Sequence, residues 1–314
     1  MASTVPTFTL LDGQKIPVIG WGNGTGDAKK TAVESGRHAV KSGLRHIDTA
    51  QGYHNEKETG QSLSDAEAEF GLEPTAVWVT SKLSTEDGDP TKAGIALEDV
   101  RASVKETISR LGRQPNLLLI HNPFVPPKGK ILEFWRILED MKESGELTAS
   151  IGVSNFRPQD FKELFSGDLR YKPVVNQLEY HPYVLEHLDE TLAIQQEHGI
   201  LTEAYGPLTP VIRHPTGGPI KPILERIAAR LSKESGKEVD AAQALLLWTR
   251  AKGVVAVTAS GNEGRIEKLA ATQSLPDLTK EEVEEVEAAG RKVYYRHYDE
   301  HMKDMPLPNL PKDI

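Results

Sequence analysis

Short apolar runs alternate with longer amphipathic segments along most of the chain. Between the runs, segments such as 98–112 and 131–145 carry apolar residues at positions i, i+3, i+4 and i+7, which predicts amphipathic helices. A strand followed by a helix, repeated about every 30 residues, is typical of a parallel α/β fold. The runs themselves predict eight short buried strands, at 17–20, 44–49, 76–82, 116–122, 149–155, 173–177, 200–206 and 254–260.

The segments outside this repetition have simpler interpretations. Residues 6–20 predict a β-hairpin that turns at Asp12-Gly13 and leads into the first strand. Residues 217–222 (GGPIKP) predict a loop. The polar segment 294–314 predicts a surface extension at the C-terminal end.

Two α/β architectures compete for this pattern: an open doubly wound sheet and a closed barrel. An open sheet that binds a dinucleotide would use the glycine-rich turn at 20–27, with Asp48 on the ribose. No glycine triple there fits G-x-G-x-x-G, because Thr25, Asp27 and Lys29 occupy the third positions. With eight strands and no Pro/Ser-rich linker, the sequence predicts one (β/α)8 TIM-barrel domain over residues 1–314.

Composition narrows the class of partner. The net charge is −9 and the basic residues are scattered, which argues against nucleic acid or an anionic membrane as a partner. There is no cysteine, so disulfides, thiolate catalysis and thiolate metal sites are excluded. The first residues lack a basic segment followed by an apolar one, and no apolar run reaches membrane-spanning length. We therefore expect a cytoplasmic protein that acts on a small molecule.

Four chemically useful side chains follow the second, third and fourth predicted strands. In a (β/α)8 barrel the C-terminal strand ends meet at one face, so Asp48, Tyr53, Lys82 and His121 are expected to lie together. A phenol has a pKa of about 10, and a neighbouring ammonium is expected to lower it. Tyr53, Lys82 and Asp48 would then form a tuned proton donor, with His121 orienting a substrate carbonyl.

Three specific motifs contain or accompany these residues: RHIDTAQGYHNEKETG (45–60), IGVSNF (151–156) and VVNQLEYHP (174–182). With them, the chain resembles the aldo-keto reductases over nearly its whole length. The resemblance implies a barrel that binds NAD(P)H without a doubly wound domain. It also implies hydride transfer to a carbonyl carbon, with the tyrosine giving a proton to the oxygen. WVTSKL, LLLIHNP, AYGPL and SGNEGRI are further matching segments.

The resemblance carries over to individual positions. Asp48, Tyr53, Lys82 and His121 match the catalytic four, with Tyr53 as the general acid. Ser154, Asn155 and Gln177 match the residues that hold the carboxamide, and Tyr205 matches the ring that stacks on the nicotinamide. The remaining implied cofactor contacts are Gly206 and Leu208 at the pyrophosphate, Ser260, Asn262 and Arg265 at the adenosine 2′-phosphate, and Gly24 with Asn23 or Thr25 in the first loop.

The chain departs from the family near the 2′-phosphate. Ala259 stands where many relatives carry a lysine, and Lys268 and Leu269 stand where a Glu-Asn pair is usual. Arg265 can still make charge-assisted bonds to a phosphate, and Lys268 can add charge. We therefore expect NADPH as the cofactor, with NADH possible.

Positions that often carry aromatic pocket walls are also replaced. Gly24 lies in an NGTG turn, Ser84 follows SKL, and Asn122 follows His121. These replacements predict a wide, polar substrate pocket that includes Ser84 and Asn122. The pattern most resembles the fungal branch that reduces α-keto amides, ketolactones and conjugated polyketones.

Other functions remain open at this stage. The same scaffold serves aldose or sugar reductases, polyol dehydrogenases and non-catalytic regulatory subunits. A barrel hydrolase or isomerase would need a second acid facing Asp48, and Glu179 and Glu203 are the candidates. His297 and His301 lie four residues apart without the H-E-x-x-H order, so we expect no metal site. The resemblance implies instead that the C-terminal segment 294–314 rims the site. We expect a monomer or a weak homodimer.

Overall fold

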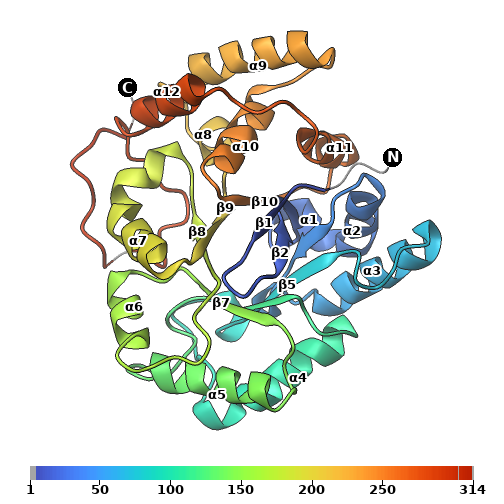
Figure 1. The fold of residues 1–314 in the computed structure, drawn as a ribbon, viewed down its shortest axis with the longest axis vertical. Coiled ribbons are helices and arrows are strands. Elements are labelled where there is room, and N and C mark those ends of the chain that lie inside the picture. The colour runs from blue at the N-terminus through green and yellow to red at the C-terminus, as the bar shows by residue number, and fades with distance from the viewer. Residues whose placement is uncertain (1–4, 303, 313–314) are drawn as a thin grey trace.

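The structure is a computed structural model, and it describes residues 5–302 and 304–312. In these residues eight parallel strands close into a barrel in the order β10-β3-β4-β5-β6-β7-β8-β9, and helices surround it (Figure 1). The predicted (β/α)8 barrel is confirmed, and every strand overlaps its predicted range. The strands are β3 (Ile19–Gly22), β4 (His46–Asp48), β5 (Trp78–Leu83), β6 (Leu117–Ile120), β7 (Ser150–Ser154), β8 (Val175–Glu179), β9 (Leu201–Tyr205) and β10 (Val255–Ala259).

The outer helices bury the apolar stripes that the sequence predicts. In α5 (Ile131–Glu143), Ile131, Phe134, Trp135 and Leu138 are buried, which is the i, i+3, i+4, i+7 pattern. The other helices are α1 (Gly26–Lys30), α2 (Ala32–Lys41), α3 (Glu56–Phe70), α4 (Val100–Leu111), α6 (Pro158–Leu164), α7 (Leu185–His198), α8 (Thr209–Ile212), α9 (Lys221–Ser235), α10 (Ala241–Ala251), α11 (Glu263–Thr272) and α12 (Lys280–Gly290).

The predicted N-terminal hairpin closes one end of the barrel. β1 (Thr7–Thr9) pairs antiparallel with β2 (Lys15–Pro17), and Gly13 has the positive φ of 85° that the turn requires. Leu10 and Ile16 pack in one cluster with residues that begin barrel strands, such as Leu117. In Figure 1 the hairpin, in dark blue, crosses the centre of the barrel. The opposite, C-terminal end of the strands is therefore the end that can hold a site.

The chain after α12 runs over that C-terminal end without forming a helix in its described residues. The buried carboxylate of Glu179, at the end of β8, accepts hydrogen bonds from the backbone N–H groups of His297 (2.9 Å) and Tyr298 (3.1 Å). The Arg296 side chain also donates to Glu179, at 3.4 Å. Residues 1–4 of the predicted domain 1–314 lie outside the described residues, as do residues 303 and 313–314 of the predicted extension 294–314.

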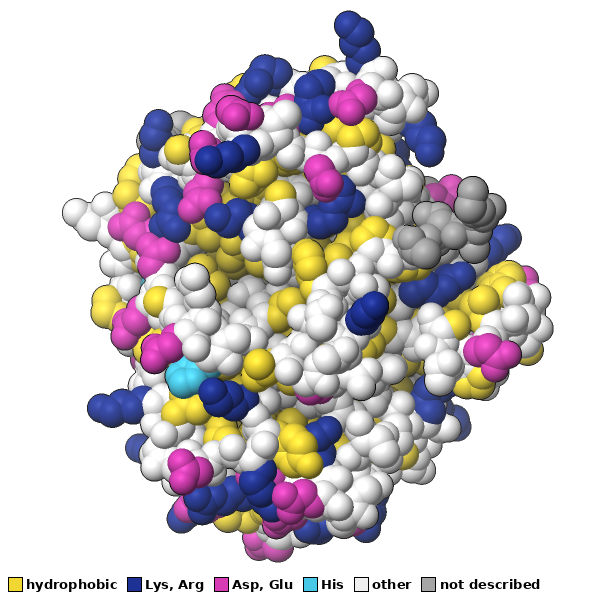
Figure 2. Space-filling model, in the orientation of Figure 1, with side chains coloured by type: hydrophobic (Ala, Val, Ile, Leu, Met, Phe, Trp, Pro, Cys, Tyr) yellow, Lys and Arg dark blue, Asp and Glu magenta, His cyan; other side chains and the backbone are white. Residues whose placement is uncertain are grey.

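Two general properties of the surface bear on partners. None of the helices in the described residues is long and apolar enough to cross a membrane. On the face drawn in Figure 2, basic and acidic side chains are interspersed rather than gathered by sign. That face therefore presents no large basic field of the kind that binds nucleic acid.

Candidate active site

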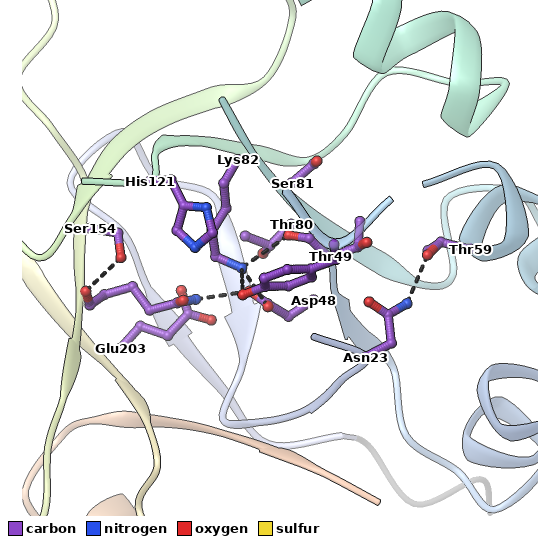
Figure 3. Close-up of polar contacts among 12 residues, drawn as sticks. Asn23, Asp48, Thr49, Thr59, Thr80, Ser81, Lys82, His121, Ser154 and Glu203 are labelled. Atoms are coloured by element: carbon purple, nitrogen blue, oxygen red, sulfur yellow. Dashed lines mark hydrogen bonds and ion pairs between the residues drawn. The ribbon is translucent and has the colours of Figure 1, made fainter. Parts of the chain in front are cut away.

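A cavity of about 350 Å³ opens at the C-terminal ends of the barrel strands. Three of the four predicted catalytic residues, Asp48, Tyr53 and His121, line it, and Lys82 lies buried beneath them. The parallel register explains the grouping, because Asp48 pairs with Thr80 and Leu83 with Ile120, so the strands end side by side. Figure 3 shows the labelled side chains of Asp48, Lys82 and His121 converging from three strand ends.

Lys82 is the centre of this group. Its ammonium nitrogen lies 2.5 Å from Asp48 Oδ1, 2.9 Å from the Thr49 carbonyl oxygen and 3.4 Å from the Tyr53 hydroxyl oxygen. The side chain is completely buried. Gln177 donates to the other oxygen of Asp48 at 2.8 Å, so both carboxylate oxygens are occupied and the carboxylate is held in one orientation.

Tyr53 is placed by a short 3₁₀ turn and by a close contact with glycine. It ends the turn at Gln51–Tyr53 that follows β4, and its N–H bonds the Ala50 carbonyl oxygen at 3.1 Å. A Cβ at Gly24 would lie 2.6 Å from the Tyr53 ring, so a larger residue there would push the phenol out of place. Gly24 therefore acts on the site by its lack of a side chain.

The electrostatics of Tyr53 differ from the sequence-based expectation. Burial raises the pKa of the phenol above its ordinary value, and the Lys82 charge lowers it only in part. The ammonium acts in the expected direction, but desolvation outweighs it, so the net pKa of Tyr53 is raised rather than lowered. Burial would lower the pKa of Lys82, but Asp48 and Tyr53 override it, so that pKa is raised. Tyr53 is therefore protonated and Lys82 charged at neutral pH.

His121 is a neutral imidazole held by a serine. Burial and the nearby Lys82 charge place its pKa well below the ordinary value. Its ring lies edge-on to Tyr53 with 5.5 Å between ring centroids. The hydroxyl of Ser84 lies 2.7 Å from His121 Nδ1, and as donor it leaves the ring proton on Nε2. An Nε2–H group can then donate to a carbonyl oxygen.

The two predicted pocket residues lie elsewhere. Ser84 is among the buried polar residues, behind His121, and its N–H bonds Gln51 Oε1 at 3.0 Å. Asn122 is completely buried, and its Oδ1 accepts from the Phe124 N–H at 2.9 Å. Neither side chain lines the cavity. Ser84 therefore positions His121, and Asn122 fixes the local backbone. Neither residue supports the prediction of a wide, polar pocket.

The predicted carboxamide and nicotinamide residues form one hydrogen-bonded wall of the cavity. Asn155 has a positive φ of 59° and donates to the His121 carbonyl oxygen at 3.0 Å, while its Oδ1 accepts from the Tyr205 hydroxyl at 2.7 Å. Ser154 donates to the Gln177 carbonyl oxygen at 2.9 Å. The four predicted residues, Ser154, Asn155, Gln177 and Tyr205, all line the cavity. The arrangement offers amide and hydroxyl groups beside an aromatic face.

A second cavity, of about 370 Å³, adjoins the first. It contains Ser260, Arg265 and Lys268, while Asn262 caps α11 by accepting from the Arg265 N–H at 3.0 Å. Arg265 makes no ion pair within the part of the chain that the structure describes, whereas Lys268 lies 3.1 Å from Asp240 Oδ2. Both cavities share the wall residues Leu208, Ile212, Arg213, Thr258 and Ala259.

The two adjoining cavities together form one cleft. Among the other predicted cofactor contacts, Gly206, with a φ of 59°, Leu208 and Thr25 of the first loop line the first cavity. Asn23 does not: it is completely buried and donates to Thr59 Oγ1 at 2.8 Å (Figure 3). Of the two candidates in that loop, only Thr25 can contact a ligand in the cleft.

The C-terminal segment contributes residues that the sequence did not single out as lining. Tyr298, Glu300 and His301 form one side of the first cavity, and the Tyr298 ring lies edge-on to Tyr205 at 5.4 Å. The sequence analysis expects the segment 294–314 to rim the site, but it does not identify these three residues as lining it. Among the described residues no group of three His, Asp or Glu side chains is arranged to hold a metal. Arg213, in the wall that both cavities share, was also missed.

The two extra acids considered for hydrolysis do not face the cavity. Glu179 and Glu203 are both completely buried, and neither is a lining residue. Glu179 is occupied by the C-terminal segment, as described above. A pair of carboxylates around a substrate is therefore not built from these residues.

Comparison with known proteins confirms the resemblance to the aldo-keto reductases. Residues 19–291 match the model of the Aldo/keto reductase family. The chain is 32% identical to the "NAD/NADP-dependent indole-3-acetaldehyde reductase" of Schizosaccharomyces pombe, over 93% of this chain and 98% of that protein. It is 31% identical to the "Glycerol 2-dehydrogenase (NADP(+))" of Hypocrea jecorina, over 95% of each.

A solved structure is also similar. The Bombyx mori aldo-keto reductase in complex with NADP superposes with a TM-score of 0.79 at 29% identity, covering 97% of this chain and 99% of that one. The family match spans the barrel strands and the residues that meet at their C-terminal ends. The chain therefore belongs to the aldo/keto reductase family and is an oxidoreductase.

Proposed function

We propose that this protein reduces aldehydes and ketones to alcohols with NADPH, and that Tyr53 gives the proton. The observation that carries the proposal is the buried Lys82 ammonium, 2.5 Å from Asp48 and 3.4 Å from the Tyr53 hydroxyl, at the floor of the cavity. When bound, the nicotinamide supplies the hydride that adds to the carbonyl carbon. The chain's own residues supply the proton, the orientation and the charge.

Tyr53 donates its hydroxyl proton to the carbonyl oxygen, which becomes the alcohol oxygen. The phenolate that remains is opposite in charge to the neighbouring Lys82, which lowers the free energy of forming it in a buried site. Asp48 holds Lys82 in place and charged. His121 donates from Nε2 to the same carbonyl oxygen and thereby sets its direction, while Ser84 holds the ring at Nδ1.

The cofactor would be held along the two joined cavities. Ser154, Asn155 and Gln177 would hold the carboxamide, and Tyr205 would provide an aromatic face for the nicotinamide ring; their common position on one cavity wall supports these roles. Gly206 and Leu208 would contact the pyrophosphate. Gly24 and Thr25 line the same cavity from the first loop.

NADPH is favoured over NADH because of Arg265. Its guanidinium lies in the second cavity beside Ser260, with an Nε to Oγ distance of 3.1 Å, and can form charge-assisted bonds to a phosphate. Lys268 adds positive charge, although its ion pair with Asp240 reduces it. Arg213 lies in the wall between the two cavities and can contribute from the other side.

The substrates that fit best are carbonyls with a neighbouring oxygen or nitrogen, such as α-keto amides, ketolactones and dicarbonyls. The support comes from the cavity wall, where Glu300 and His301 line the same cavity as Tyr53 and His121. Among the described residues, His301 Nδ1 is buried without a hydrogen-bond partner, so a polar substrate atom would satisfy it. Aldoses and polyols also carry such oxygens and are the second candidate class.

One kinetic panel tests the proposal. Oxidation of NADPH and of NADH is followed with an α-keto lactone, an α-keto ester, an aldose and an aromatic aldehyde. We expect NADPH-dependent reduction with the highest kcat/KM for the two dicarbonyl compounds. The highest kcat/KM for the aldose would favour the sugar-reductase candidate, and no oxidation of either coenzyme would overturn the proposal. We expect the protein to act as a monomer or a weak homodimer.

A further inference from the structure

Glu203 lies directly under the catalytic group and takes no part in the mechanism above. It is in β9, two residues before Tyr205, and alternate residues of a barrel strand point inward at successive depths. Tyr205 lines the cavity, and Glu203 is one layer deeper. Its side chain is completely buried, and neither carboxylate oxygen has a hydrogen-bond partner in the described chain.

The neighbouring strands repeat this layering. On β4, His46 lies two residues before Asp48, and on β5, Thr80 lies two residues before Lys82. His46 Nε2 is 2.9 Å from Thr80 Oγ1 and 3.5 Å from Glu203 Oε1. His46, Thr80 and Glu203 therefore form a polar layer directly beneath Asp48 and Lys82. Figure 3 shows Glu203 and Thr80 beside the Asp48–Lys82 pair.

The lower layer holds one proton at neutral pH. Burial lowers the pKa of His46 to about 4. Burial, with the Asp48 charge adding and the Lys82 charge opposing, raises the pKa of Glu203 to about 8. Whether the proton is on the carboxyl or on the imidazole, the pair has no net charge.

We propose that the His46–Glu203 pair is a charge-setting layer: by remaining neutral, it leaves Asp48 as the single counter-ion of Lys82 and so sets how readily Tyr53 releases its proton. Glu203 is a positioning residue, because it touches neither substrate nor cofactor sites. The other groups that face it are Gln177 of β8, paired with it in register, and Val255 of β10, neither of which titrates. The titratable neighbours are thus His46, Asp48 and Lys82, with Tyr53 above them.

The direction of the effect follows from charge. Above its pKa, Glu203 becomes a carboxylate that interacts with Lys82 and opposes a second negative charge on Tyr53. Tyr53 then forms a phenolate less readily. Oxidation of an alcohol needs that phenolate as the proton acceptor. Ionised Glu203 is therefore expected to move the rise in the rate of alcohol oxidation to higher pH.

The decisive variant is Glu203→Gln, which keeps the shape and stays neutral at every pH. Below about pH 7 we expect the phenolate titration of this variant to match that of the wild type. The ionisation midpoint of Tyr53 should lie about half to one pH unit lower than in the wild type, which is a factor of roughly 3–10 in the phenolate equilibrium. Glu203→Met, which is neutral but cannot hydrogen-bond, should shift in the same direction. Glu56→Gln is the matched control, since Glu56 is a buried carboxyl that bonds Ser81 next to Lys82.

Two readouts are used on the full chain. Phenolate formation is titrated by difference absorbance, and the component that disappears in Tyr53→Phe reports Tyr53 without any coenzyme or substrate. The pH profile of alcohol oxidation with NADP⁺ is the second readout, and only this one rests on the proposed function. A Tyr53 midpoint in both folded Glu203 variants equal to that of the wild type would overturn the inference. A shifted titration with no oxidoreductase activity would instead overturn the proposed function alone.

Discussion

The ammonium nitrogen of Lys82 lies 3.4 Å from the hydroxyl oxygen of Tyr53, and it does so at a completely buried position. A charge at this distance in a desolvated site interacts far more strongly with a phenolate than it would in water. The Asp48 carboxylate at 2.5 Å keeps the lysine charged, and its own charge offsets only part of the effect of Lys82 on the pKa of Tyr53. Lys82 is therefore the residue through which the barrel acts on Tyr53.

Lys82→Met is expected to remove this support. Because Lys82 is the group that lowers the pKa of Tyr53, its loss should raise that pKa further and slow catalysis by roughly 10²–10⁴-fold, the range typical of general acid–base groups. Alcohol oxidation needs the phenolate, so its alkaline midpoint should move to higher pH. The pH dependence of kcat for alcohol oxidation measures both effects. Lys92→Met, at an exposed loop ion pair, is the control, and an unchanged midpoint in Lys82→Met would contradict the coupling.

Ser84→Ala should impair His121 without changing the cavity wall. The serine hydroxyl holds Nδ1 at 2.7 Å, and without it the imidazole can adopt the tautomer that presents no Nε2 proton. Loss of one such bond typically costs about 0.5–1.5 kcal/mol, or roughly 2–12-fold in kcat/KM. Steady-state kinetics with one carbonyl substrate measures it. Ser81→Ala, on the same strand but bonded to Glu56, should have a smaller effect; equal losses would show that Ser84 is only structural.

Arg265→Ala should separate the two coenzymes. Arg265 makes no ion pair within the described chain, so its guanidinium can bond a 2′-phosphate. Losing a charge-assisted contact costs about 1.5–3 kcal/mol, or roughly 10–150-fold in affinity. NADPH should weaken by that factor, and NADH, which has no 2′-phosphate, should barely change. Quenching of tryptophan fluorescence gives both Kd values. An equal loss for both coenzymes would locate the phosphate elsewhere, with Lys268 the next candidate.

Glu179→Gln should loosen the C-terminal segment. The carboxylate accepts the N–H groups of His297 and Tyr298, and its pKa is lowered: burial acts to raise it, but the bonds from His181 and the Arg296 charge prevail. The neutral amide accepts more weakly, so Tyr298, Glu300 and His301 should be less well placed.

We expect the KM for a dicarbonyl substrate to rise roughly tenfold, as for a loss of about 1.4 kcal/mol, while the Kd of NADPH changes little. Asp304→Asn is the control, because its ion pair with Arg157 is largely exposed on the aspartate side and contributes little. If Glu179→Gln left KM at the wild-type value, the segment would have no part in substrate binding.

Much of the fold could be predicted because its signals are local. Strands such as β6 (LLLI) are short apolar runs that are buried throughout, and helices such as α4 end at a glycine with positive φ, Gly112. The grouping of Asp48, Lys82 and His121 could be predicted from the strand ends, since parallel strands bring those ends together. Residues after a strand are harder, because their direction depends on the turn: His121 faces the cavity, whereas the next residue, Asn122, is turned into the protein.

Other features of the site depend on three-dimensional surroundings that no pattern encodes. Burial raises the pKa of Tyr53, and the Lys82 charge lowers it in part. The sequence indicated the charge but not the degree of burial. The role of the segment after α12 depends on Glu179, which is over 100 residues away in the chain. The same is true of His46 and Glu203, which meet only when the barrel closes.

The most direct test of the account is Tyr53→Phe, which removes the proton donor and leaves the ring that packs on Gly24. Two quantities are measured on the same preparation: the Kd of NADPH by fluorescence quenching, and kcat for reduction of an α-keto lactone. The account predicts an essentially unchanged Kd and a kcat lower by about 10²–10⁴-fold. A variant that binds NADPH and keeps near-native kcat would contradict it, because the proton would then come from another group.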